Sequence, residues 1–286
     1  MSSEKINLRK TRTFSESISI TFDLVKNNLA ILLKSFFALS FPFLIIAIFL
    51  LSSSIVNALQ QDAGFSSSHT AFNLLGYIFM SVGTFVYLLA INVIYKKYIF
   101  NDDPKQITVG EVWTEIVNHL GTFIGAGFII SILIFFGTLF LLIPGIYLAV
   151  SLSFVFFIIT FENAGTKAAI DRCFAIIKNN WWSTFGFFLI IFMIQMALDY
   201  TLVLPITFIN VWIFKPMLTS HTADTTNAFS FIVILFYTLQ IMFSTLLSSI
   251  IGAAIVVKYF SLVEEKEQIG IREEIATMDQ DTAEEK

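Results

Sequence analysis

Charge is scarce in this chain of 286 residues, because Asp, Glu, Lys and Arg together make up only 13% of it. Soluble domains carry about 25% charged residues, which help to cover their surface. Apolar residues make up 56% of the sequence, Phe alone occurs 33 times, and the mean hydropathy is +0.80. This composition excludes a soluble enzyme or nucleic-acid-binding protein. It indicates an integral membrane protein that crosses the bilayer several times.

Residues that carry chemistry are also few. The single cysteine, Cys173, cannot form an internal disulfide. The three histidines, His69, His119 and His221, lie far apart and match no metal-ligand spacing. The sequence has no phosphate-binding glycine loop, no nucleophile with a base and no basic patch of the nucleic-acid-binding type. We therefore expect no catalytic site, cofactor, metal or nucleic-acid partner.

Six apolar runs are long enough for the hydrocarbon core of a bilayer, which a helix of about 20 residues crosses. They cover residues 29–56, 74–95, 120–142, 146–161, 182–204 and 229–257. Helices are expected, because lipid offers no partner for free backbone groups and the runs lack the alternation of barrel strands. The sequence predicts an all-α polytopic protein with a membrane domain over residues 14–261. A cytoplasmic segment, 1–13, precedes this domain, and an acidic cytoplasmic tail, 262–286, follows it.

The basic residues lie almost entirely on one side of these spans. The segment before span one, the connections after spans two and four, and the segment after span six together hold 16 of the 17 Lys and Arg residues. Only Lys215 falls on the opposite side. Because basic loops stay in the cytoplasm, both termini are predicted to be cytoplasmic.

The three outward connections differ in kind. Residues 57–72 are polar and rich in Ser, which predicts a flexible loop. The stretch from Leu142 to Ile146 contains Pro144 and Gly145, which predict a tight hairpin turn. Residues 201–217 are apolar and aromatic but too short to span, so they lie along the outer interface or fold back into the protein.

One pattern of apolar and polar residues precedes each odd-numbered span at identical offsets. Its three copies are Ile18, Phe22, Val25, Asn27 and Asn28; Val109, Trp113, Ile116, Asn118 and His119; and Ile170, Phe174, Ile177, Asn179 and Asn180. The apolar spacing predicts a short amphipathic helix, and the Asn suits a turn into the span. Any helix at a membrane surface shows such a stripe. The equal placement of the copies nevertheless favours three parallel repeats, each an interfacial amphipathic helix plus a helical hairpin.

Two of the three interfacial helices have a recognisable start. Thr13 and Glu16, and likewise Thr108 and Glu111, have the spacing of a capping box. In this motif the Thr hydroxyl and the acid three residues later satisfy free backbone N–H groups. The third copy lacks the acid.

The stretch 142–185 and the end of span six resemble a known family. The residues that carry this resemblance are Pro144-Gly145-Ile146-Tyr147, Glu162, Ala169, Arg172, Lys178-Asn179-Asn180-Trp181 and the run from Lys258 to Glu267. They resemble the membrane domain found with some bacterial glycerophosphoryl diester phosphodiesterases, and related uncharacterised six-span families of the YciC kind. Cys173 departs from the small polar residue expected at its position. The resemblance implies a bacterial cytoplasmic membrane protein, but no phosphodiesterase activity, because the catalytic barrel of about 250 residues has no counterpart here.

Four charged residues are candidates for contact with lipid headgroups or with a protein partner. They are Lys26, Glu162, Arg172 and Lys178. Glu162 and Arg172 could equally form a structural ion pair. The three basic residues also fit the positive-inside bias alone.

Small residues in two spans predict close helix packing, within one chain or between chains. They are Gly121 and Gly125 in span three, and Ser244, Ser248 and Gly252 in span six.

Three further residues in or beside the spans have simpler interpretations. Asp199 is the best candidate for a functional carboxylate within a span, but its place near the outer end of span five favours a solvated interfacial carboxylate. Lys34 can extend its ammonium group to the cytoplasmic headgroups. Cys173 lies on the apolar stripe of its helix, which predicts burial or lipid contact.

The leading functional hypothesis is a non-enzymatic membrane protein that organises lipids or partner proteins, with the acidic tail as a docking segment for a cytoplasmic partner. The alternative is a transporter or flippase for a lipid-like or hydrophobic substrate. Spans two, three, four and six have no charge in their apolar middles, which argues against an ion-coupled pump. A membrane-embedded enzyme has the least support.

Overall fold

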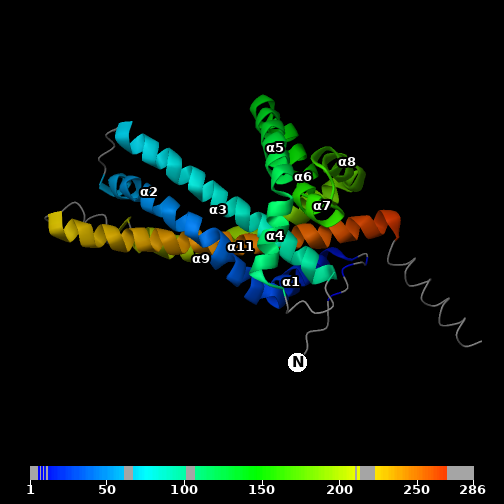
Figure 1. The fold of residues 1–286 in the computed structure, drawn as a ribbon, viewed down its shortest axis with the longest axis horizontal. Coiled ribbons are helices and arrows are strands. Elements are labelled where there is room, and N and C mark those ends of the chain that lie inside the picture. Colours follow the sequence, from blue (N-terminus) through cyan, green and yellow to red (C-terminus); the bar gives the residue numbers. More distant parts are fainter. Residues whose placement is uncertain are drawn as a thin grey trace, which may run out of the picture. The chain divides into compact units, whose positions relative to one another are not determined.

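A computed structural model of the chain describes residues 6, 8, 10, 12–60, 67–100, 107–209, 211–212 and 223–268. These residues form helices and contain no strand (Figure 1). The elements are α1 (Phe14–Ser35), η1 (Phe36–Ser40), α2 (Phe41–Gln60), α3 (Ser67–Phe100), α4 (Val109–Asn118), α5 (Leu120–Phe140), α6 (Leu142–Ser151), α7 (Val155–Glu162), α8 (Thr166–Ile177), α9 (Trp181–Ile209) and α11 (Ala223–Glu267).

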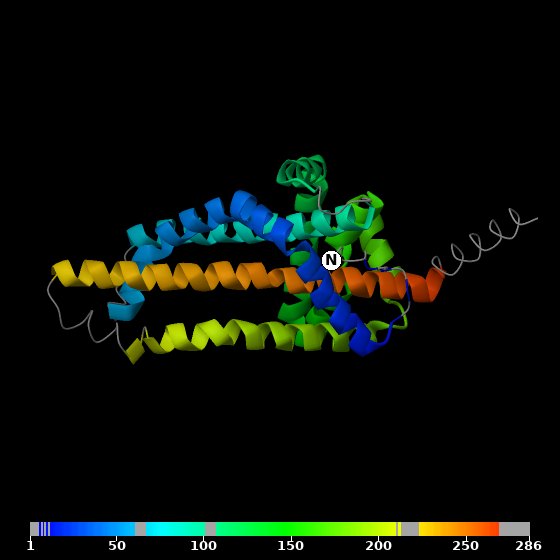
Figure 2. The ribbon, with the colours of Figure 1, turned by 90° about the horizontal axis from the view of Figure 1, so that it is seen from below.

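Within the described part of the chain, six segments are long and apolar enough to cross a membrane. They are Phe14–Ser52, Ala71–Phe100, Leu120–Phe140, Leu142–Glu162, Trp181–Ile209 and Phe231–Glu267. The predicted all-α fold and the number of spans are therefore confirmed. The last segment lies in a helix of 45 residues, α11, which runs without a break (Figure 2). This helix continues past span six into the predicted tail as far as Glu267, and residues 269–286 lie outside the described residues.

The chain divides into two compact units. Unit 1 comprises the residues up to Leu29, Ile91–Phe192 and the residues from Ile250 onward. Unit 2 comprises Ala30–Ala90 and Met193–Ser249.

Helix α7 lies at the centre of unit 1. Its apolar run has no polar face, and most of its side chains are fully buried. The Phe157 ring contacts Tyr259 and Phe260 of α11 at centroid distances of 5.0 and 6.2 Å. The Phe161 ring stacks on Phe100 of α3 at 5.0 Å. Aromatic contacts therefore join α7 to helices that lie far from it in the sequence.

The predicted turn at Asn27-Asn28 is wrong, because α1 runs through both residues. The side-chain amide of Asn28 is buried and donates to the Leu24 carbonyl, 2.9 Å away and four residues earlier. This bond satisfies the polar group inside a continuous helix. The chain then passes through the π-helical turn η1, in which the Phe41 N–H donates to the Phe36 carbonyl. Pro42 follows directly. Its ring has no N–H and crowds the carbonyl four residues earlier, which accounts for the widened turn.

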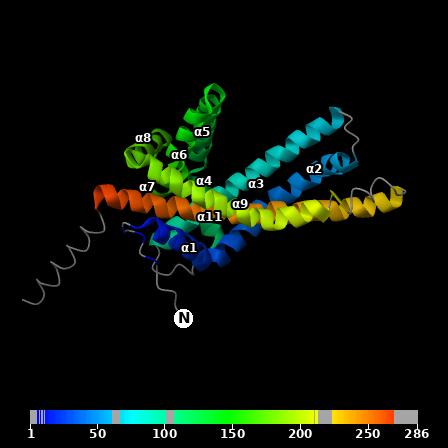
Figure 3. The ribbon, with the colours of Figure 1, turned by 180° about the vertical axis from the view of Figure 1, so that it is seen from behind.

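The hairpin between α5 and α6 lies elsewhere than predicted. Leu141 is extended, with φ −157° and ψ 133°, and it alone separates the two helices. Pro144 and Gly145 belong to the first turn of α6, where the missing Pro N–H costs no hydrogen bond. Figure 3 shows α5 and α6 side by side. Gly145 serves their packing, since a Cβ there would meet Thr138 Oγ1 and lie 2.9 Å from Thr138 Cα.

Span four is interrupted between α6 and α7. Leu152, Ser153 and Phe154 form a turn held by short-range bonds, such as the Val155 N–H to the Leu152 carbonyl at 3.2 Å. The Ser153 hydroxyl donates to the Val150 carbonyl at 2.8 Å. The sequence pattern did not predict this break, because the residues around it are uniformly apolar.

Candidate functional site

A polar cluster joins α7, α8 and the end of α11 in unit 1. Arg172 of α8 donates from Nε to Glu162 Oε1 at 3.1 Å, and its Nη1 lies 2.6 Å from Glu267 Oε1. The Tyr259 hydroxyl donates to the same Glu162 oxygen at 2.5 Å. We call these four residues the Arg172 cluster. The ion pair that the sequence left as one alternative is therefore formed.

The electrostatics of the Arg172 cluster favour the charged form of its centre. The hydrogen bond with Glu267 and the bond with Glu162 raise the pKa of Arg172, although partial burial acts against them. Arg172 is thus a permanent cation held between two carboxylates. In this state it ties α8 to both α7 and α11.

Further hydrogen bonds attach α11 to α8, to the start of α9 and to the connection between them. Lys266 Nζ donates to the carbonyls of Ala175 and Lys178, at 2.5 and 2.9 Å. A cation at the C-terminal end of a helix complements its free carbonyls and its dipole. Asn180 Nδ2 donates to Glu265 Oε2 at 3.0 Å, and Lys258 Nζ donates to Ser183 Oγ at 3.1 Å. The acidic start of the predicted tail is consequently part of the folded unit.

Helix α4 is held by two ion pairs to the end of α3. Lys96 Nζ lies 2.7 Å from Glu115 Oε1, and Lys97 Nζ lies 3.3 Å from Glu111 Oε2. Lys97 and the Thr108 cap lower the pKa of Glu111. Burial is the largest single effect on Glu115 and acts to raise its pKa, but the hydrogen bond and charge of Lys96 together with nearby His119 and Lys97 give a net downward shift. From the sequence, the two lysines indicated only orientation, although the acids at positions 111 and 115 are one turn apart.

Both predicted capping boxes begin helices as expected. The Thr13 hydroxyl accepts from the Glu16 N–H at 3.4 Å, and the Glu16 carboxylate accepts from the Thr13 N–H at 2.9 Å. The Thr108 hydroxyl accepts from the Glu111 N–H at 3.4 Å. Helix α8 begins at Thr166 after Gly165, without a side-chain cap.

Two of the three aromatic residues of the predicted repeat, Phe22 and Trp113, are exposed on their helices. Phe22 is 36% exposed, Trp113 is 45% exposed, and Phe174 is partly buried. The residue just before each of them is buried; these are Thr21, Val112 and Cys173. In the first copy the protein-facing stripe, Ser17, Thr21 and Leu24, is therefore displaced by one residue from the predicted one, whereas Ile116 and Ile177 of the predicted stripe are buried in the other two copies.

The polar residues of the repeat differ between its copies. Asn27, Asn118 and Asn179 are all exposed. Asn27 lies inside a helix, Asn118 ends α4, and Asn179 adopts the left-handed conformation with φ 72° before α9. The predicted turn thus occurs in the second and third copies. Lys26 and Lys178 are exposed, with side chains accessible from outside.

Cys173 is fully buried, and burial raises the pKa of its thiol to about 12. The thiol stays protonated at neutral pH and is a poor nucleophile. The described residues contain no group of three or more His, Cys, Asp or Glu side chains that could hold a metal ion. The side chains of His69 and His221 lie outside the described residues.

The predicted packing residues have different environments. Gly252 packs on α3, because a Cβ there would collide with Ile91 Cγ2. A Cβ at Gly121 would have no described atom within 4 Å, and one at Gly125 would have only Thr166 Oγ1, at 3.8 Å. Ser244 donates to Asp199 at 2.7 Å, and Ser248 donates to the carbonyl of Thr245 in its own helix.

Two glycines that were not among the predicted packing residues pack in unit 2. A Cβ at Gly76 would lie 2.7 Å from Leu51, and one at Gly83 would lie 3.0 Å from Phe43 Cβ. The Ser40 hydroxyl also donates to the Gly83 carbonyl at 2.9 Å. Gly76 and Gly83 are seven residues, or about two helical turns, apart, so the sequence already indicated that they share one face of α3.

Comparison with protein-family models, with curated proteins and with solved structures finds no match for the chain.

Proposed function

We propose that the protein is a non-enzymatic integral protein of a bacterial cytoplasmic membrane that organises lipids at the cytoplasmic face through its interfacial helices. Both termini lie in the cytoplasm, as the distribution of basic residues indicates. The resemblance to the membrane domains described above supports this setting.

The observation that carries the proposal is the placement of Phe22 and Trp113. Each follows a buried residue at the same position of its repeat and presents a third or more of its surface outward. Aromatic rings favour the headgroup region of a bilayer, and basic residues nearby favour anionic lipids. Lys26 of α1 and Lys178 at the end of α8 are exposed, whereas Arg172 is held between carboxylates and is not proposed as a lipid contact.

The test replaces Trp113 and Phe174 by Asp and measures the binding of anionic lipid to the purified protein by native mass spectrometry. We expect retained lipid to fall, because a charge at the interface opposes insertion of the helix face. The matched controls are Thr114→Asp and Ala175→Asp. They add the same charge at the exposed residues that directly follow Trp113 and Phe174. Asp23 already occupies the equivalent position after Phe22. Equal lipid retention in the test and control variants would refute the proposal.

A carrier for a lipid-like substrate is the second candidate, and the interruption of span four favours it. Broken helices form substrate sites in many transporters, because their free backbone groups face a cavity. Single cysteines at Thr201 or Leu204, introduced with Cys173→Ala, would report on the outer segment. Substrate-dependent labelling supports a carrier, whereas constant labelling counts against it. The remainder of that predicted segment, residues 210 and 213–217, lies outside the described residues.

A cytoplasmic partner bound by the tail remains a prediction. Such a segment would follow the end of α11, where Lys266 is hydrogen-bonded to the last residues of α8 and the connection after it. Deletion of residues 269–286 should remove any co-purifying protein while leaving the thermal stability of the membrane domain unchanged.

A further inference from the structure

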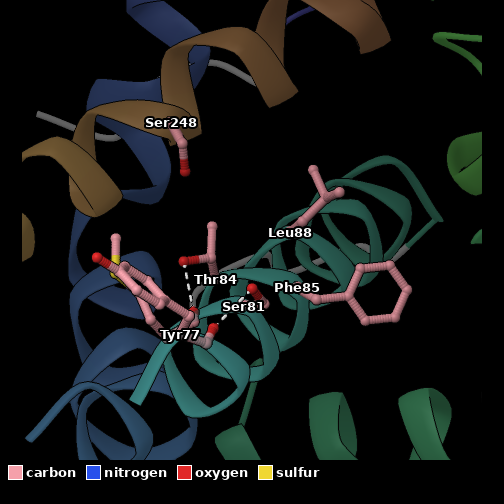
Figure 4. Close-up of a pocket in the computed structure, with 7 residues that line it drawn as sticks. Tyr77, Ser81, Thr84, Phe85, Leu88 and Ser248 are labelled. Carbon is pink, nitrogen blue, oxygen red and sulfur yellow. Dashed lines mark hydrogen bonds between the residues drawn. The ribbon is translucent and has the colours of Figure 1, made fainter. Parts of the chain in front are cut away.

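Unit 2 contains an open groove beside α3, and Ser248 is the one residue of its lining that the sequence had marked, for helix packing (Figure 4). Its volume is about 480 Å³, and its lining consists of Tyr77, Met80, Ser81, Thr84, Phe85, Leu88 and Ser248. Sites for small ligands commonly measure about 300–1,000 Å³. The α3 residues recur at intervals of three or four, so they occupy one helix face. Ser248 of α11 completes the groove.

The hydroxyl groups of the groove are already hydrogen-bonded to the helices that carry them. Ser81 donates to the Tyr77 carbonyl at 2.8 Å, and Thr84 donates to the Met80 carbonyl at 2.9 Å. Ser248 donates to the Thr245 carbonyl at 2.6 Å. These three donors are therefore engaged, and the remaining lining is mainly hydrocarbon, sulfur and aromatic ring. A groove of this chemistry favours an apolar ligand.

The surroundings of the groove are also apolar. The lining residues belong to two of the segments that are long and apolar enough to cross a membrane. On α3, Leu74 and Ile78 are 63% and 49% exposed. In the bilayer core such surfaces face acyl chains, because water is absent there. The groove is thus presented to lipid tails.

The two ends of the groove differ in polarity. Tyr77 lies at one end, is 60% exposed and carries a phenol hydroxyl. Leu88 lies at the other end, eleven residues along α3, which corresponds to about 16 Å of helix. Tyrosine favours the boundary between headgroups and tails, because its ring is apolar and its hydroxyl is polar.

We propose that this groove binds one acyl chain of a bilayer phospholipid, with the headgroup on the Tyr77 side and the chain end toward Leu88. Tyr77 lies toward the start of α3, so the lipid belongs to the leaflet at that end of the helix. With the orientation proposed above, this is the outer leaflet. The site itself does not depend on the interfacial helices.

The experiment uses the full-length protein in nanodiscs of phosphatidylethanolamine and phosphatidylglycerol that contain a trace of phospholipid with a diazirine near the middle of one chain. After illumination, peptide mass spectrometry maps the labelled residues. We expect labels to concentrate between Met80 and Leu88. Thr84→Trp fills the groove and should lower this labelling about tenfold, equivalent to about 1.4 kcal/mol of binding. Ile78→Trp adds the same ring to α3 outside the lining and should leave the labelling unchanged.

Uniform labelling along the exposed side of α3, or equal labelling of the two Trp variants, would overturn the proposal. If Thr84→Trp does not give a monodisperse protein, Ser81→Leu provides a smaller obstruction with the same expected direction. A diazirine placed next to the ester should label near Tyr77, and labelling near Leu88 would reverse the assigned polarity. The Trp113→Asp and Phe174→Asp variant should retain groove labelling, which separates this site from the proposed interfacial function.

Discussion

The close approach of α5 and α6 at Gly145 allows a quantitative test of the packing. In Gly145→Ala, the new Cβ would meet Thr138 Oγ1 and lie 2.9 Å from both the Cα and the N of Thr138. Comfortable carbon contacts are about 3.5–4.0 Å, so the backbones must separate by roughly 0.5–1 Å. A rotamer change cannot relieve this clash, because two of the three atoms belong to the backbone.

The expected cost follows from two opposing effects. Overpacking of a close-packed interface costs about 1–3 kcal/mol. Alanine forms helices better than glycine, which raises the free energy of unfolding by at most about 1 kcal/mol. None of the described glycines has a positive φ, so the loss of a glycine conformation adds nothing. We therefore expect Gly145→Ala to lower the free energy of unfolding by about 1–2 kcal/mol.

Unfolding in a mixed-micelle titration with sodium dodecyl sulfate measures this change, with helicity as the signal. Gly186→Ala is the matched control, because no described atom lies within 4 Å of the position that its Cβ would take. The control should be neutral or more stable by up to about 1 kcal/mol. A Gly145→Ala protein at least as stable as Gly186→Ala would refute the reasoning.

A double variant sharpens the test. A Cβ at Gly137 would lie 3.2 Å from Gly145 Cα, so the two glycines face one another across the hairpin. Once one alanine has separated the helices, the second meets less resistance. The double variant should therefore lose less stability than the two single variants added together.

Three further outcomes are expected. Arg172→Ala leaves two carboxylates without their shared cation. It should lower the free energy of unfolding by about 1–2 kcal/mol, a value that already allows for partial solvent exposure, and limited proteolysis should cut faster near Glu267. Glu111 has a lowered pKa, so its contribution is present at neutral pH and is lost as pH falls through that pKa; the difference in thermal midpoint between wild type and Glu111→Gln should shrink toward zero below about pH 4. Asn179→Ala should lower the free energy of unfolding by about 1 kcal/mol, because alanine is strained at the left-handed φ of 72°. Asn179→Gly should remain close to wild type in the same detergent unfolding assay, because glycine adopts this conformation freely.

Features set by a short stretch of sequence were predicted well. The six spans follow from the length of each apolar run, because the cost of exposing backbone to lipid forces each run into a helix. The starts of α1 and α4 follow from Thr and Glu three residues apart, because both partners of the cap lie in one turn.

Turns inside apolar sequence were predicted less well, since neighbouring helices decide them. The same Asn pattern ends α4 and precedes α9, yet it leaves α1 unbroken, where Asn28 bonds to Leu24. Pro144 and Gly145 were expected to make a turn but belong to a helix, and the glycine provides room for Thr138. A dipeptide permits several backbone conformations, and packing selects one.

Composition and local spacing were sufficient to predict the fold class and the number of spans, because each apolar run forms its helix independently of its neighbours. Which charges pair and where a groove opens depend on contacts between helices that are distant in the sequence. Arg172 meets Glu162 and Glu267 across 10 and 95 positions, and Ser248 completes a groove formed otherwise by α3. Such partners are set by the packing of whole helices, on which the spacing of residues along one helix carries no information.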